Sequence, residues 1–277
     1  MLCRILHCCD GTSWQRRAIR EPPVLAWAAQ QAAKIAVLVL FAGAMVWPAA
    51  AGETTIEEVR AVLRDAVGGP ANLSGRDLSG LNLSGMDLRG VNLQGAVLKG
   101  ADLSGANLSG SNLDVAIMRG ANLKDAKLRD VSAHSTVLAE ADLRGADLSG
   151  ALLVCNLEYA RLDGADLTAA RLGADMRNQP MGLMRVSLRK ASLRDAILDG
   201  ADLSRGMLEF ADFSGASLRG ANLLRAEAGG ANFSGADLTG ANLGMADINS
   251  AQFVKIKGGD TIIGLDTAIN ADTAQFD

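Results

Sequence analysis

The residues with the most obvious chemical potential are His134 and its neighbours. Ser132 and Ser135 flank this histidine, and Asp130 lies four residues before it. These types serve nucleophilic catalysis when a pocket holds the base against the nucleophile. The repeat described below turns His134 outward, onto an open face with no pocket to exclude water. The sequence therefore predicts a solvated surface histidine and no enzyme activity.

Asn or Asp recurs along most of the chain, and a column of carboxylates could bind Ca²⁺. The two types alternate irregularly, however, and no nine-residue calcium-binding pattern is present, so we interpret them as corner-forming residues. Cys155 is the only cysteine after residue 51, which excludes a disulfide within that part of the chain, and no Cys/His spacing resembles a zinc site. The sequence predicts no metal and no cofactor.

The charge balance gives no reason to expect nucleic acid as a partner. The first 51 residues hold five of the 27 basic side chains and two of the 31 acidic ones. The remaining chain therefore has 22 basic and 29 acidic side chains, a balance of −7. Such a surface does not attract a polyanion.

Residues 1–51 have the pattern of a signal peptide. A 12-residue apolar stretch, 35–46, follows several basic residues and precedes Ala49-x-Ala51, which predicts cleavage before Gly52 and a periplasmic or secreted protein. The stretch is shorter than the roughly 20 residues of a membrane span. An uncleaved anchor over 32–51 is the alternative, and only then do we expect contact with a membrane.

A large apolar residue recurs at every fifth position over two long stretches. It occupies 16 of 17 such positions in 73–153 and 13 of 14 in 188–253. A period of five fits neither an α-helix nor a long strand, so the chain must turn once per unit. In residues 101–105, as in most units, Leu and the Ala two positions before it share a face. Asp, Ser and Gly supply the turn.

This pattern, Ala-(Asn/Asp)-Leu-X-X, resembles the pentapeptide-repeat family over some 185 of the 277 residues. The resemblance implies an all-β fold, a right-handed quadrilateral parallel β-helix with four units, or 20 residues, in each coil. About nine coils spaced by roughly 4.8 Å would form a rod about 40 Å long. We expect this repeat domain to span 70–254.

Both ends of such a stack need covering, because an open end exposes apolar side chains and unpaired backbone. Residues 52–69 are predicted to form a short N-terminal capping α-helix that begins with a capping box of Thr55 and Glu58. Arg76 takes an inward position in the first coil, where the sequence offers it no partner. Residues 255–277 lose the five-residue period, and we expect them to fold over the last coil.

The phase of the repeat is interrupted at 153–187. Leu153 and Leu188 are nevertheless 35 residues apart, which corresponds to seven units. The sequence predicts a kink and a small loop, in which Pro180 cannot donate a backbone hydrogen bond. Gln179, Pro180 and Met181 are the loop residues that a partner could contact. An irregularity without function is the competing explanation.

Val97, Ile117 and Val137 occupy a position that normally holds Asn or Asp. They are 20 residues apart, so a 20-residue coil stacks them on one outer face, and Ile197 joins them if the interruption preserves the coil count. An exposed apolar column is a candidate interface for a protein partner, a second copy or the folded-back tail. The alternative explanation is β-branched filling of a sheet face.

These features favour an exported, non-enzymatic scaffold that binds a protein partner or associates with itself. The resemblance raises an alternative, since some pentapeptide-repeat proteins mimic DNA, bind type II topoisomerases such as gyrase and protect them from inhibitors. That function needs a cytoplasmic location and a continuous acidic face. Cations such as Lys99, Arg119 and Arg144 instead intersperse the chain, so we expect the scaffold.

Overall fold

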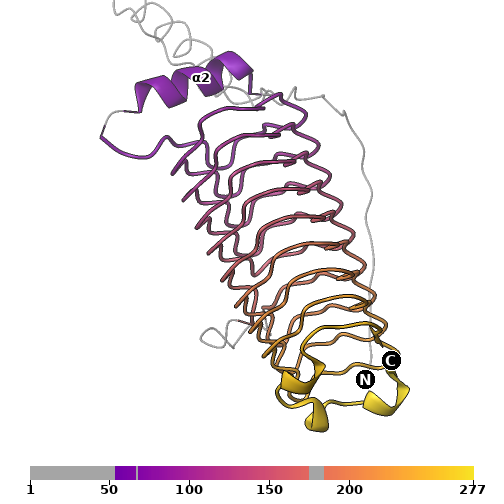
Figure 1. The fold of residues 1–277 in the computed structure, drawn as a ribbon. Coiled ribbons are helices and arrows are strands. Elements are labelled where there is room, and N and C mark those ends of the chain that lie inside the picture. The colour runs from indigo at the N-terminus through magenta and orange to yellow at the C-terminus, as the bar shows by residue number, and fades with distance from the viewer. Residues whose placement is uncertain (1–53, 67, 175–183) are drawn as a thin grey trace, which may run out of the picture. The chain divides into compact units, whose positions relative to one another are not determined.

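The computed structural model describes residues 54–66, 68–174 and 184–277 (Figure 1). The chain divides into two compact units, Met1–Ala51 and Gly52–Asp277. The predicted signal peptide and the predicted contact residues Gln179, Pro180 and Met181 lie outside the described residues, so those predictions stay predictions. Among the residues that are described, no helix has the length and apolar character to cross a membrane.

The second unit is a stack of coils joined by single parallel bridges (Figure 1). In the first coil, bridges start at four residues, and each pairs with the residue 20 positions later. We call the resulting columns faces 1 to 4; they begin at Asn72, Asp77, Asn82 and Asp87 respectively. Each coil therefore has four faces, with one five-residue unit on each.

Residues 101–105 show why the repeat folds in this way. The Ala101 and Leu103 side chains are fully buried, and the Leu103 N–H donates to the carbonyl of Asn122 in the next coil at 2.7 Å. Asp102 Oδ1 accepts from the Ser104 N–H at 3.0 Å, which closes the corner. Gly105 then has φ +63°, a conformation that most side chains disfavour. Burial of the Leu and Ala columns drives the stacking.

The interior is aliphatic except on face 3 of the later coils. There Phe213, Phe233, Phe253 and Phe276 form a continuous stack, with successive ring centroids 5.0–5.1 Å apart and nearly parallel planes. Strands β1, Gln252–Phe253, and β2, Gln275–Phe276, pair in parallel beside the end of this stack.

Helix α2, Ile56–Asp65, lies against the first coil (Figure 1). Its capping box is present, because Thr55 accepts from the Glu58 N–H at 3.3 Å and Glu58 Oε2 accepts from the Thr55 N–H at 3.0 Å. Val59 is buried, and other apolar residues of the helix pack against the core. Arg76 is exposed; its inward position belongs to the first coil, where no earlier coil covers it.

The coil count through the interruption differs from the predicted one. Leu152 pairs with Arg171, 19 residues on, whereas Arg171 pairs with Asp202, 31 residues on. The longer coil holds eleven residues beyond the usual 20, and these include the span 175–183. The 35 residues from Leu153 to Leu188 therefore make five units instead of seven.

The prediction that Ile197 joins the column of Val97 is consequently wrong. Ile197 pairs with Asp166 and Ser217 on face 4. A difference of two units rotates the later repeats by half a coil, from face 2 to the opposite face. Counting residues across an insertion does not count coils.

The last coil is built from units of six residues. Its column residues Lys257, Ile263 and Ile269 follow one another at intervals of six and pair with the coil before. Each additional residue is absorbed by a 3₁₀ turn that ends in threonine, namely η2 (Gly259–Thr261), η3 (Leu265–Thr267) and η4 (Ala271–Thr273).

The threonine hydroxyls of this coil replace backbone acceptors. In earlier coils, a corner N–H such as that of Gly220 donates to a carbonyl of the next coil, here Thr239 at 2.9 Å. At the end of the stack, the corner N–H groups donate to Oγ1 of Thr261, Thr267 and Thr273; the donors are Gly240, Met245 and Ser250, at 3.0, 3.2 and 3.0 Å. Asp277 Oδ2 accepts from the Lys255 N–H at the fourth corner.

Candidate functional site

The apolar ladder of face 2 consists of Val97, Ile117 and Val137. The structure pairs Val97 with Ile117 and Ile117 with Val137 in consecutive coils. Ile117 is 42% exposed and the two valines are half-buried. The three side chains therefore form one outward apolar strip, as the 20-residue spacing predicts. Whether a partner covers it stays a prediction.

The neighbours of His134 do not form a catalytic triad. Ser132 Oγ donates to Asp114 Oδ1 at 2.7 Å, and the backbone N–H of His134 donates to the same oxygen at 2.9 Å. The proton of this serine therefore goes to a carboxylate rather than to an imidazole. Asp130 occupies a corner with φ +54°, and His134 itself is half-buried.

The Asn and Asp columns form corners, as Asn72 and Asp77 illustrate. Oδ1 of each accepts from the N–H two residues later at 3.0 Å, which is the local turn that these residues favour. Within the described part of the chain, no group of three or more His, Cys, Asp or Glu side chains is placed to hold a metal ion. Burial raises the pKa of the Cys155 thiol to about 12, so the thiol stays protonated and unreactive at neutral pH.

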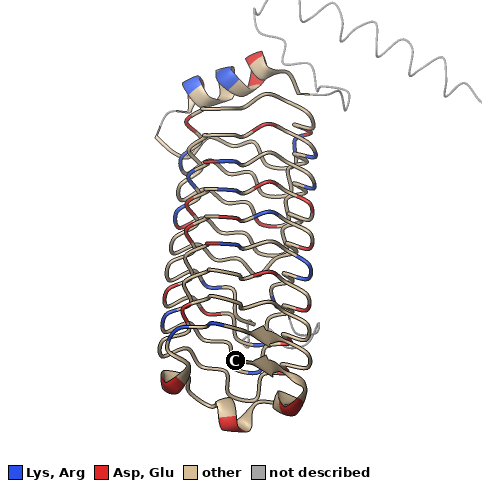
Figure 2. Cartoon of the chain, turned by 45° about the vertical axis from the view of Figure 1, so that its right-hand side comes forward, with Lys and Arg blue, Asp and Glu red and all other residues tan. Residues whose placement is uncertain are grey.

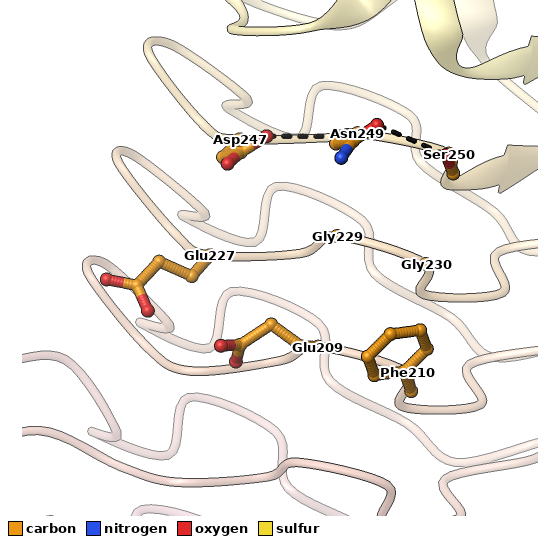
Figure 3. Close-up of a pocket in the computed structure, with 8 residues that line it drawn as sticks. All are labelled: Glu209, Phe210, Glu227, Gly229, Gly230, Asp247, Asn249 and Ser250. Atoms are coloured by element: carbon orange, nitrogen blue, oxygen red, sulfur yellow. Dashed lines mark hydrogen bonds between the residues drawn. The ribbon is translucent and has the colours of Figure 1, made fainter.

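A pocket of about 360 Å³ lies further along face 2 (Figure 3). It exists because Gly229 and Gly230 place no side chains between two better-filled coils. A Cβ on Gly229 would meet only the Asn249 carbonyl, at 3.6 Å. The remaining lining comes from the coils on either side, namely Glu209, Phe210, Glu227, Asp247, Asn249 and Ser250.

The carboxylates of this pocket are partly neutralised by two arginines. Arg189 Nη2 lies 2.7 Å from Glu209 Oε1 and 3.8 Å from Glu227 Oε2, while Arg185 pairs with Glu227. Burial alone would raise the pKa of Glu209, but the hydrogen bond from Arg189 outweighs it and the pKa lies below its ordinary value. Glu209 is therefore ionised at neutral pH.

The corner beside this pocket carries large side chains where other coils have glycine. Tyr159, Lys190 and Phe210 follow one another in successive coils with φ between +56° and +59°. Lys190 Nζ lies 5.3 Å from the centre of the Tyr159 ring, and Phe210 is 65% exposed. Bulky residues adopt this backbone conformation only at a cost, and such strain often marks a functional surface.

Sequence reasoning missed this pocket. Its residues are separated by about 20 positions each, so they come together only after the coil register is known. The signals were present as exceptions to the repeat: a Gly-Gly pair at 229–230 and an aromatic residue at 210 in place of the usual corner glycine. Neither exception has meaning until the two are placed in adjacent coils.

Comparisons with known proteins agree with this architecture. The family model described as pentapeptide repeats matches in 8 copies, over 71–105, 96–132, 116–153, 183–220 and 216–253. No curated protein matches the chain. Among solved structures, HetL is similar, a pentapeptide repeat protein involved in heterocyst differentiation regulation from the cyanobacterium Nostoc sp. strain PCC 7120. It is 28% identical with a TM-score of 0.62, and the match covers 80% of this chain and 95% of HetL.

Two further structures match with lower TM-scores. QnrB1, a plasmid-mediated fluoroquinolone resistance protein, is 22% identical over 74% of this chain and 89% of its own, with a TM-score of 0.32 in a trypsin-treated form. A pentapeptide repeat protein of the Arabidopsis thaliana thylakoid lumen is 30% identical over 49% of this chain and 70% of its own, with a TM-score of 0.16. The family-model matches span more than half of the sequence, the fold is a right-handed β-helix solenoid, and the chain belongs to the pentapeptide-repeat family.

Proposed function

We propose that this protein is an exported, non-enzymatic interaction scaffold whose ladder on face 2 contacts a protein partner or a second copy. The observation that carries the proposal is the exposed Ile117, stacked between Val97 and Val137 on a surface that elsewhere presents Asn and Asp. A continuous apolar strip on a polar surface favours burial against another protein. HetL, which shares the fold, is involved in regulation of heterocyst differentiation, and a regulatory contact agrees with a scaffold.

Recovery of partners from envelope extract tests the ladder. The variant Ile117→Glu places a charge in the middle of the strip and should reduce recovery of a specific partner at least tenfold. The matched control is Ile197→Glu, because Ile197 is 43% exposed, as Ile117 is 42%, but lies on the opposite face. Equal recovery with both variants would remove the ladder from the proposal.

Export rests on the leader pattern of residues 1–51. Alkaline phosphatase fused after Gly52 should be active, since that enzyme matures only outside the cytoplasm. An inactive fusion would overturn export and make the topoisomerase alternative worth testing with a gyrase supercoiling assay in the presence of an inhibitor.

The surface charges disfavour mimicry of DNA. Figure 2 shows basic and acidic residues interleaved along the coils. Several cations pair with adjacent carboxylates, as Arg144 does with Asp142 and Arg194 with Asp163. A DNA mimic needs an uninterrupted row of negative charge, and these pairs interrupt it.

We also propose that the four faces form a quadrilateral stack closed at both ends. Helix α2 covers one end through Val59, and the threonine-lined coil completes the other. Closed ends leave the side faces as the surfaces available for binding, which supports the assignment of face 2.

A further inference from the structure

We propose that the pocket at Glu209 and Phe210 binds the guanidinium of an arginine side chain from a partner protein. This inference rests on the proposed scaffold function and adds the chemistry of the partner. The pocket lies on the same face as the ladder, three coils further along, because Val137, Asn156, Ser187 and Met207 pair in succession. One partner segment can therefore contact both.

The charge of the pocket favours a cation. Glu209, Glu227 and Asp247 line it, and Arg185 and Arg189 are the cations paired with the two glutamates, so the five groups together have one negative charge. Asp247 Oδ1 accepts from the Asn249 N–H and from Asn270 Nδ2. The local charge is thus negative, while the two arginines occupy only part of the acceptor capacity.

Glu209 has one carboxylate oxygen without a donor. Both the Nε and Nη2 atoms of Arg189 donate to Oε1, at 3.0 and 2.7 Å. Oε2 is buried and accepts no hydrogen bond within the described residues. A buried anionic oxygen is stabilised strongly by a charged donor. A guanidinium entering the pocket supplies that donor.

Phe210 gives the pocket an apolar wall suited to an arginine stem. Figure 3 shows the Phe210 ring at one end of the pocket and the Glu227 carboxylate at the other. The ring lies over Gly230, since a Cβ there would come within 2.6 Å of it, so this glycine is what allows the ring its place. Planar guanidinium groups stack on aromatic faces, and their methylene stems pack on apolar surface.

Titration of the full chain with Nα-acetyl-arginine amide, followed by NMR, tests the site. We expect saturable shifts of the Gly229 and Gly230 amide signals with a millimolar dissociation constant. The citrulline analogue has the same shape without the charge and should bind at least tenfold more weakly. Glu209→Gln should weaken binding of the arginine probe by a similar factor.

A second variant keeps the test decisive if Glu209→Gln impairs folding. Gly229→Leu fills the pocket without changing any charge, and the equivalent position on face 1 already holds Leu224; it should abolish the saturable shifts. Ile117→Glu should leave them unchanged, which separates failure of the ladder from failure of the pocket. Equal binding of arginine and citrulline probes, or unchanged binding by Gly229→Leu, would overturn the proposal.

Discussion

Among single residues, those at the fifth position of each unit are the most constrained. Gly105 has φ +63° there, whereas Val115, a β-branched residue, is held at φ +54°. Valine in this conformation is strained by about 1–3 kcal/mol, and asparagine tolerates it better, as Asn270 does at φ +60°. We expect Val115→Asn to raise the free energy of unfolding by about 1 kcal/mol, measured by thermal denaturation.

The reciprocal change serves as the control. A Cβ on Gly105 meets nothing within 4 Å, so Gly105→Val introduces backbone strain without a clash. It should lower the free energy of unfolding by about 1–2 kcal/mol. Changes of the same sign in both variants would contradict the role of the corner conformation.

Cys155 is a second residue whose environment makes a measurable difference. Burial raises the pKa of its thiol from 9.0 to about 12, so the folded state keeps the proton that the unfolded state releases. The resulting stabilisation is complete below pH 9 and is lost as the pH rises towards 12. We expect Cys155→Val to show a smaller loss of stability than the wild type over this range, in denaturant titrations at fixed pH. Identical slopes would contradict the burial of the thiol.

At the scale of elements, the terminal coil depends on its three threonines. Replacing Thr261, Thr267 and Thr273 together by valine keeps the shape of the side chains but removes the acceptors of three corner N–H groups. Each loss should destabilise the coil by about 1 kcal/mol. Hydrogen exchange of the Gly240, Met245 and Ser250 amides should accelerate, while that of Gly105 should not change. The triple serine variant retains the hydroxyls and should exchange like the wild type.

The same elements show how far the sequence could predict the structure. The spacing of the leucines was enough to locate the repeat and its buried face, because every unit repeats one physical solution. It failed where the unit length changes. The Asp-Thr pairs at 260, 266 and 272 have a period of six that a search for fives passes over, and the eleven extra residues before Leu188 hid the half-coil rotation of Ile197. The pocket at Glu209 depends on that register and could not be found without it.

For the molecule as a whole, the coil is the unit that can be removed. Stability in a stacked repeat comes from each coil and its contacts with its neighbours, and the inward residues differ little between coils. Deleting 101–120 removes one residue from each column and brings Asn122 into the place of Asp102, opposite Asn82. We expect the shortened chain to unfold cooperatively, with a Tm lower by about 5 °C, in far-UV circular dichroism.

Deleting 101–118 is the matched control, since 18 residues are not a multiple of five. The leucines after the junction would then leave the inward positions, and polar residues would enter the column of Leu103 and Leu123, which are both fully buried. Burial of unpaired polar groups there should destroy the cooperative transition. If the two deletions unfolded alike, the period of the leucines would not be what holds the coils together, and every assignment of residues to faces would fail with it.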